Sequence, residues 1–232
     1  METKVYLADV RKLENKKIFN DLYSRVSPGR REKADRMVFP KDKYLSLGAG
    51  ALLEAALAAE GVTDLTMTTM QNKKPCLLYR NDIKFNISHS GTKVMCAVSD
   101  CDIGCDVEQI IDVDKKIAKR FFFSEEYKAL MRCESKDSYN DLFFRYWTLK
   151  ESFMKATGLG FKLALDEFSI SFDNGSISVK QNFDKKKYYF AEYDLKDGYK
   201  YALCSADKAI STKKVIEYDF DQPNNETVLT FV

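Results

Sequence analysis

Apolar and polar side chains alternate along residues 103–108. The odd positions carry apolar side chains and the even positions do not, in the order Ile103, Gly104, Cys105, Asp106, Val107, Glu108. Successive side chains of a β-strand point to opposite faces, so this order predicts a strand with one apolar and one acidic face. Taken alone, the pattern favours an ordinary half-buried strand with a wet acidic face. Its two carboxylates nevertheless stand at i and i+2, within reach of one hard cation such as Mg²⁺.

Periodicity on either side of this stretch predicts the other elements. Apolar positions at helical spacing indicate helices over 12–26, 43–60 and 143–157, with shorter helices from 27 and over 112–120. Runs of β-branched and aromatic residues predict strands over 5–10, 65–70, 76–79, 94–99, 168–172, 176–180, 188–193 and 199–206. Ser124 is expected to cap a helix because two acids follow it. The polar residues 208–232 are predicted to form a peripheral tail.

Two segments of the chain repeat in the same order. Residues 34–42 resemble 118–126, and 44–47 resemble 146–149. Segments 44–47 and 146–149 are each expected to open a helix. The two segments lie further apart in the second copy, because residues 127–142 add a helical segment there. We therefore expect an α+β protein of two related α/β halves, residues 1–101 and 102–232, with an active site between them.

Composition and charge narrow the possible functions. The 232 residues are 45% hydrophobic and carry a net charge of +2, which indicates a globular protein with no overall attraction to nucleic acid or membranes. No apolar run approaches the length of a membrane span, and the first residues lack a signal core. Six cysteines without a CxxC pair and a single histidine argue against zinc. We expect a cytoplasmic protein with reduced cysteines.

The helix predicted over 143–157 gathers charges on one face. Trp147, Lys150, Glu151, Met154 and Lys155 follow one another at i, i+3, i+4, i+7 and i+8. Burying these charges without partners is costly. A Glu151–Lys155 pair on a solvated face is one explanation. The other is a site in which Glu151 joins Asp106 and Glu108 around Mg²⁺, while Lys150 and Lys155 bind phosphate oxygens.

Two further places offer groups that bind anions. His89 is followed by Ser90 and Gly91, which predict a tight turn at a strand end where the imidazole can donate to an anion. Arg30, Arg31 and Lys33 form a small basic patch. Each feature also has a simpler explanation: His89 can be a structural histidine, and the basic patch can be a solvated helix face.

Three motifs together resemble those of the 4′-phosphopantetheinyl transferases. They are residues 85–91 (FNISHSG), 103–108 (IGCDVE) and 147–155 (WTLKESFMK), in the family's order and spacing. The length and the two halves resemble the surfactin-synthetase-activating type. This resemblance implies a pseudo-twofold pair of α/β halves that moves the phosphopantetheine arm of coenzyme A to a serine of an acyl or peptidyl carrier protein, leaving adenosine 3′,5′-bisphosphate.

The resemblance also implies roles for single residues. Asp106, Glu108 and Glu151 would bind Mg²⁺, or Mn²⁺ in its place, and Glu151 would also be the candidate base. His89 and Lys155 would hold the pyrophosphate, with Ser88 near the nucleotide. Lys74, Arg30 and Lys33 would reach the coenzyme A phosphates. The expected protein is a monomer with a carrier surface near 111–142, where Phe121–Phe123 and Met131 form either an apolar patch or core packing.

Two other functions stay open at this point. One is a catalytically silent module that binds carrier proteins, and the other is a Mg²⁺-dependent phosphotransferase acting on a small alcohol. The acidic and basic residues named above argue against the silent module, because such a module is expected to lack one of them.

Overall fold

The computed structural model describes residues 1–70, 74–173, 175–208, 210, 214–222 and 227–230. The first half contains β1 (Lys4–Asp9), η1 (Val10–Glu14), α1 (Lys16–Arg25), α2 (Pro28–Asp35), α3 (Pro40–Ala59), β2 (Met67–Thr69), β3 (Pro75–Leu77), β4 (Lys84–Ser90) and β5 (Lys93–Ser99). The second half contains β6 (Ile103–Gln109), α4 (Lys115–Phe121), α5 (Ser124–Met131), α6 (Lys136–Thr157), η2 (Gly160–Lys162), β7 (Ser169–Asp173), β8 (Ser176–Lys180), β9 (Tyr189–Tyr193) and β10 (Tyr199–Ser205). Two more strands follow, β11 (Lys214–Glu217) and β12 (Thr227–Thr230).

The two halves share one strand order. In each half the first strand pairs with the last, which pairs with the one before it, giving β1-β5-β4 and β6-β10-β9. All four pairings are antiparallel, with Tyr6 opposite Cys96 in the first half and Asp106 opposite Ala202 in the second. A long helix precedes a two-stranded hairpin in both halves. The predicted α+β fold of two similar halves is confirmed. The boundary between residues 101 and 102 stays a prediction.

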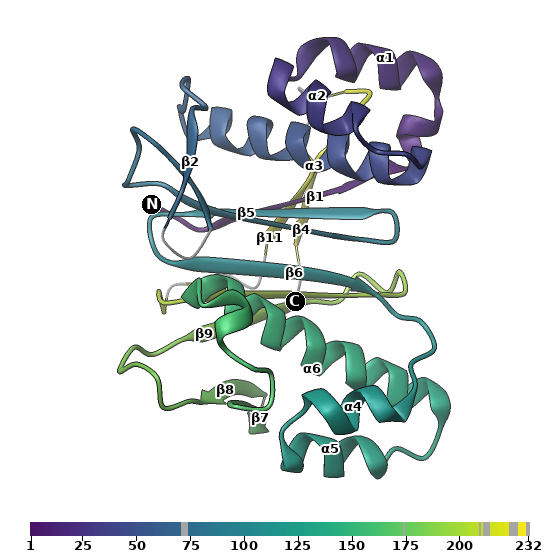
Figure 1. Ribbon diagram of the computed structural model, residues 1–232, viewed down its shortest axis with the longest axis vertical. Helices are drawn as coiled ribbons and strands as arrows, with labels where there is room; N and C mark the ends of the chain where they lie inside the picture. Colours follow the sequence, from purple (N-terminus) through teal and green to yellow (C-terminus); the bar gives the residue numbers. More distant parts are fainter. Residues whose placement is uncertain (71–73, 174, 209, 211–213, 223–226, 231–232) are drawn as a thin grey trace.

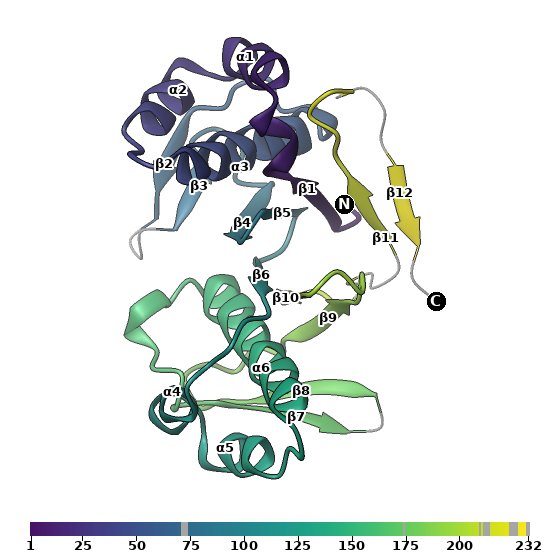
Figure 2. The ribbon, with the colours of Figure 1, turned by 90° about the vertical axis from the view of Figure 1, so that its right-hand side faces the viewer.

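The elements stack as helices, sheet, sheet and helices (Figures 1 and 2). The two sheets share a core in which Val5, Leu7 and Met95 meet the apolar side chains of β6, so the predicted apolar face of 103–108 is confirmed as buried. Two further cores lie under the helices, one in each half. Among the helices of the described residues, none combines the length and apolarity needed to cross a membrane.

The two long helices begin earlier than their apolar periodicity predicts. α3 starts at Pro40. Proline suits the first turn because backbone N–H groups there have no intrahelical acceptor, so its missing N–H costs nothing. α6 starts at Lys136, where the Ser135 side chain accepts from the backbone N–H of Ser138 at 3.0 Å. Ser124 is the first residue of α5 rather than its cap. Phe123 takes the cap position, and its N–H donates to Glu126 at 2.9 Å.

The prediction of a peripheral tail over 208–232 is wrong for the described part of that segment. β11 pairs in parallel with β1, with Ile216 opposite Tyr6, and β12 pairs with β11. Val215 is completely buried between the sheets, and Phe220 enters the first-half core. The end of the chain therefore extends the first-half sheet, through contacts that its short apolar runs do not reveal.

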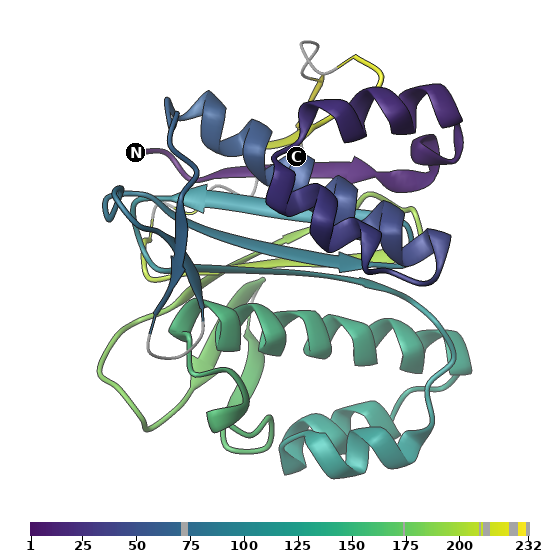
Figure 3. The same cartoon turned by 45° about the horizontal axis from the view of Figure 1, so that its top comes forward.

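Helix α6 lies directly on β6 (Figure 3), and Gly104 stands in their contact. A Cβ at position 104 would stand 2.1 Å from the carbonyl oxygen of Ser152 and 2.3 Å from the nitrogen of Ala156. Only glycine permits this approach. The contact fixes how far α6 stands from β6, and so how close the side chains of α6 come to Asp106.

Candidate functional site

The free edge of β6 faces β4 across the junction of the halves. One edge of β6 pairs with β10, while side chains of β4 reach the other. Cys105 N donates to Asn86 Oδ1 at 2.9 Å, and Gln109 N donates to Ser90 Oγ at 3.2 Å. These bonds satisfy backbone groups that have no strand partner. They also align β4 with the acidic residues of β6.

Asp106 is the buried centre of the site, with 2% of its surface exposed. Its Oδ1 accepts from Ser88 Oγ at 2.7 Å and from Lys155 Nζ at 2.6 Å. Its Oδ2 is buried and has no hydrogen-bond partner among the described residues. Burial raises the pKa of Asp106, although Lys155 and Ser88 oppose the rise. A buried carboxylate oxygen without a donor is an available ligand for a cation.

Glu108 and Glu151 flank Asp106 and are both half-buried. Glu108 accepts from Ser90 Oγ at 2.7 Å, and burial raises its pKa to about 7. Burial and the charge of Asp106 raise the pKa of Glu151 as well. Within the described parts of the chain, Glu151 has neither a hydrogen-bond nor an ion-pair partner. The three carboxylates thus stand together with more negative charge than their surroundings balance.

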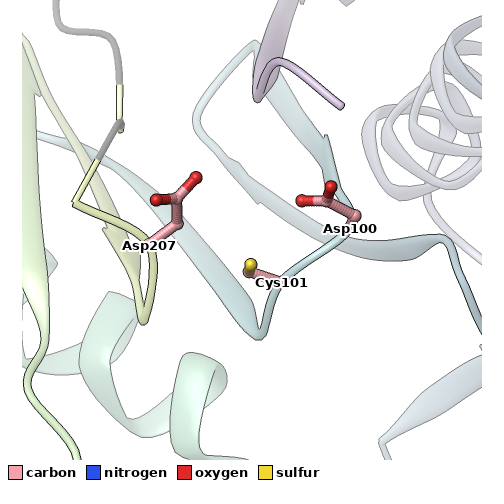
Figure 4. A group of neighbouring side chains, drawn as sticks. All are labelled: Asp100, Cys101 and Asp207. Carbon is pink, nitrogen blue, oxygen red and sulfur yellow. The ribbon is translucent and has the colours of Figure 1, made fainter.

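These three carboxylates are the type of ligand that magnesium prefers, but their oxygen atoms are not gathered closely enough to bind one ion in this conformation. Their ligand atoms do not all lie within 4.8 Å of one another. Within the described residues, the only group meeting that limit is Asp100, Cys101 and Asp207 (Figure 4). That group stands apart from the predicted site, and its Asp100 already pairs with the N-terminal amine.

Lys155 is the cation of the site. Its Nζ donates to Asp106, to Ser88 Oγ at 3.0 Å and to Cys105 O at 3.2 Å. Burial lowers its pKa, but Asp106, Cys105 and Glu151 together outweigh burial, so the pKa of Lys155 is raised. Lys155 pairs with Asp106 rather than with Glu151 one turn away, so α6 does not carry a solvated intrahelical pair at this position. Ser88 links the two charged groups.

A cavity of about 520 Å³ opens beside this cluster in the first half. Arg30 and Lys33 of α2 and His89 of β4 contribute its cationic and polar wall, and α3 and β4 contribute apolar side chains such as Leu45 and Ile87. Burial and the nearby charge of Lys155 lower the pKa of His89. The structure therefore brings Arg30, Lys33 and His89 together, as a surface that suits an anion with an apolar portion.

Lys74 does not line this cavity. Its Nζ donates to the carbonyl oxygens of Ile103 and Lys155, both at 2.8 Å, and burial lowers its pKa to about 8. These two bonds join the start of β3 to β6 and α6. This geometry gives Lys74 a structural role at the junction of the halves and offers no support for the predicted contact with a phosphate.

The prediction that Lys150 binds phosphate is wrong. Lys150 is 0% exposed, and its Nζ contacts Glu126 at 2.9 Å, Leu165 O at 2.7 Å and Phe168 O at 2.6 Å. Glu126 in turn accepts from the N–H groups of Phe123 and Ile170. The side chain of Lys150 thus turns into the second-half core, where it ties α6 to α5.

The sequence reading missed three side chains that shape the site. Glu126 is the buried partner of Lys150, and nothing in the local sequence marks it as buried. Asn86 and Ser90 satisfy the edge of β6. Their signal is present in the chain, because Asn86, Ser88 and Ser90 are polar at alternate positions of one strand.

Replacing Lys150 by Met tests its structural role. Glu126 would keep a buried charge without its cation, so we expect a loss of about 3–5 kcal/mol in the free energy of unfolding, measured in urea. The exposed pair Arg36–Glu32 is the control, because Arg36→Met should change stability by less than about 0.5 kcal/mol. A Lys150→Met/Glu126→Gln double variant should recover part of the loss. Wild-type stability in Lys150→Met would contradict the assignment.

The raised pKa of Glu108 predicts a pH-dependent stability. Between the ordinary pKa of a glutamate and about 7, the folded protein binds more protons than the unfolded chain, so stability should fall as pH rises through this window. In metal-free protein, Glu108→Gln should therefore raise the melting temperature at pH 8 and leave it near the wild-type value at pH 4.5. Parallel melting profiles of the two proteins across this range would show that the carboxylate is not strained.

Comparison with known proteins agrees with this geometry. Residues 102–204 match the family model described as the 4′-phosphopantetheinyl transferase superfamily. The chain is 35% identical over 185 residues to the 4′-phosphopantetheinyl transferase Sfp of Bacillus subtilis, covering 78% of this chain and 82% of Sfp. It is 32% identical over 201 residues to the 4′-phosphopantetheinyl transferase gsp of Aneurinibacillus migulanus, covering 85% and 84%. With such identity over most of both chains, this protein belongs to the 4′-phosphopantetheinyl transferase superfamily.

Proposed function

We propose that this protein transfers the 4′-phosphopantetheine arm of coenzyme A to a serine hydroxyl of an apo acyl or peptidyl carrier protein. The serine oxygen forms a new bond to phosphorus, and adenosine 3′,5′-bisphosphate leaves with the electrons of the broken P–O bond. The observation that carries the proposal is Asp106, a buried carboxylate held by Ser88 and Lys155, with one oxygen that has no partner in the part of the chain that the structure describes. It stands beside a cavity with a cationic wall.

The cationic groups divide naturally between the phosphates of coenzyme A. Lys155 lies against Asp106 and is suited to the pyrophosphate, where the reaction takes place. His89 lies next along β4 and lines the cavity, so it is suited to hold the same group from the other side. Arg30 and Lys33 remain for the nucleotide end. Ser88 holds Asp106 and Lys155 and is better placed to orient them than to contact the nucleotide.

The acidic residues supply metal binding and a base. Asp106, Glu108 and Glu151 would hold Mg²⁺, with Mn²⁺ as an alternative, and this ion would neutralise charge that develops on the leaving group. Glu151 has no partner among the described residues, and its raised pKa suits a general base. A serine hydroxyl is a weak nucleophile, so a carboxylate that takes its proton contributes directly to the rate.

Side chains near α4 and α5 support a carrier surface there. Phe122 packs in the core against Phe143 and is not available. Ile111, Ile117 and Met131 are exposed large apolar side chains in or next to these helices. We also propose that the protein is a monomer, because both halves contribute to one site within a single chain. We propose a cytoplasmic location as well, which fits the six free cysteines.

The decisive experiment is the intact mass of an apo carrier protein incubated with this protein, coenzyme A and Mg²⁺. We expect the carrier to gain one phosphopantetheine arm, and a chelator to prevent the gain. Coenzyme A binding without any gain on several acyl and peptidyl carriers would indicate a silent module instead. Transfer to small alcohols with none to carriers would indicate a different phosphotransferase.

Replacing Glu151 by Gln separates catalysis from folding. The variant keeps the shape of the side chain but loses the charge and the base, so we expect a fall in rate of at least a hundredfold. Its melting temperature should match or exceed that of the wild type, because a strained half-buried charge is removed. A variant that turns over within a few-fold of the wild type would exclude Glu151 from both roles.

A further inference from the structure

The turn between β4 and β5 is fastened to the second half by Tyr199 of β10. The side-chain oxygen of Tyr199 accepts from the backbone N–H of Thr92 at 3.0 Å. Gly91, just before Thr92, has a φ of +59°, and a Cβ there would stand 2.2 Å from the Tyr199 oxygen. The same Cβ would stand 2.6 Å from Gln109 Oε1. The backbone and the neighbours of position 91 both require glycine, which lets the Tyr199 hydroxyl rest directly on the turn.

The ring of Tyr199 is held in place independently of its hydroxyl. Tyr199 is 9% exposed and belongs to the core between the two sheets. The ammonium of Lys93 stands 5.9 Å from the centroid of the ring. Lys93 is itself fixed by ion pairs with Asp9 at 3.3 Å and Asp197 at 3.2 Å. A phenylalanine at position 199 would keep these ring contacts and lose only the bond to the turn.

The turn carries Ser90, which holds a carboxylate of the site. Ser90 Oγ donates to Glu108 Oε2 at 2.7 Å and accepts from Gln109 N at 3.2 Å. A hydroxyl has one proton to donate, so the bond that Ser90 accepts from the backbone of β6 leaves this proton for Glu108. The other oxygen, Glu108 Oε1, accepts from no described residue. Ser90 therefore fixes one oxygen of Glu108 and leaves the other for a cation.

We propose that Tyr199 is a positioning residue for the metal site. By holding the β4–β5 turn, it keeps Ser90 on Glu108 and so keeps this carboxylate oriented for the cation. Its hydroxyl bonds Thr92 and no carboxylate of the site, so it acts through the turn. The inference rests on the proposed function for the identity of the cation, Mg²⁺. Hydrogen-bond partners of a metal ligand orient that ligand, and their loss weakens metal binding by about 10–100-fold.

Metal binding by Tyr199→Phe, without coenzyme A or carrier, tests this role. Mn²⁺ is the probe, because the electron paramagnetic resonance signal of the free ion is lost on binding. We expect the Kd for Mn²⁺ to rise about tenfold or more. In steady-state transfer, KM for Mg²⁺ should rise by a similar factor, while kcat at saturating Mg²⁺ stays within about twofold of the wild type.

Tyr201→Phe is the matched control. Tyr201 is also buried, lies two positions further along β10 on the same face, and donates its hydroxyl to Asp197 at 2.8 Å rather than to the turn. Both variants lose one hydroxyl bond, so both should lower the melting temperature. Only Tyr199→Phe should weaken Mn²⁺ binding. Equal weakening in the two variants would overturn the proposal, because the effect would then follow from lost stability alone.

A double-mutant cycle with Ser90→Ala tests the path from Tyr199 to Glu108. Ser90→Ala alone should raise the Kd for Mn²⁺ about tenfold. Adding Tyr199→Phe to Ser90→Ala should raise it no further, because the path is already broken. Additive effects would overturn the proposal, and so would wild-type affinity in folded Tyr199→Phe. An unchanged Kd in Ser90→Ala would overturn it as well, whether or not Tyr199→Phe folds.

These measurements separate the inference from the proposed function. A wild-type protein that binds Mn²⁺ but transfers nothing from coenzyme A would refute the proposed function, and the Kd of Tyr199→Phe would still decide the inference. Normal transfer by the wild type, together with wild-type Mn²⁺ affinity in Tyr199→Phe, would overturn the inference alone. A wild-type protein that binds no Mn²⁺ would overturn the inference too.

Discussion

The unpaired edge of β6 is the constraint on which the site depends. Backbone groups at a strand edge buried between two halves must find partners, and here side chains supply them. Asn86 accepts from Cys105 N, Lys155 donates to Cys105 O, and Lys74 donates to Ile103 O. Lys155 also holds Asp106. The groups that join the halves and the groups proposed to act on substrate are therefore partly the same, so the site exists only while the halves are joined.

The close contact of α6 with β6 adds the second half of the geometry. Because Gly104 has no side chain, the backbone of α6 at Ser152 and Ala156 comes to rest on the strand. Glu151 and Lys155 stand one helical turn apart, next to Ser152 and Ala156. They are therefore brought beside Asp106, which follows Gly104 on the same face of β6. A bulkier residue at 104 would lift the helix and lengthen the Lys155–Asp106 contact. The glycine thus fixes a distance between charged groups that lie elsewhere in the chain.

Local patterns predicted the parts of the fold and site that depend on local geometry. The alternation over 103–108 gave β6 and its acidic face, and the helical spacing of Glu151 and Lys155 placed both near Asp106. Periodicity could not distinguish Lys150 from Lys155, because their difference lies in what each meets in space. Lys150 finds Glu126 on another helix. The parallel pairing of β11 with β1 escaped prediction for the same reason, since its partner lies some 200 residues earlier in the chain.

The charges at the junction also explain why a divalent ion fits it. When Asp106, Glu108 and Glu151 are ionised, Lys155 balances one of them and two negative charges remain. Burial raises the pKa of all three carboxyl groups, which means that the folded protein without a cation disfavours their charged forms. A cation of charge two removes that penalty, and a monovalent ion would remove only half of it. Since the positive groups Arg30 and Lys33 and the imidazole of His89 lie on the cavity side, the phosphates of a substrate can enter without adding to the repulsion at Asp106.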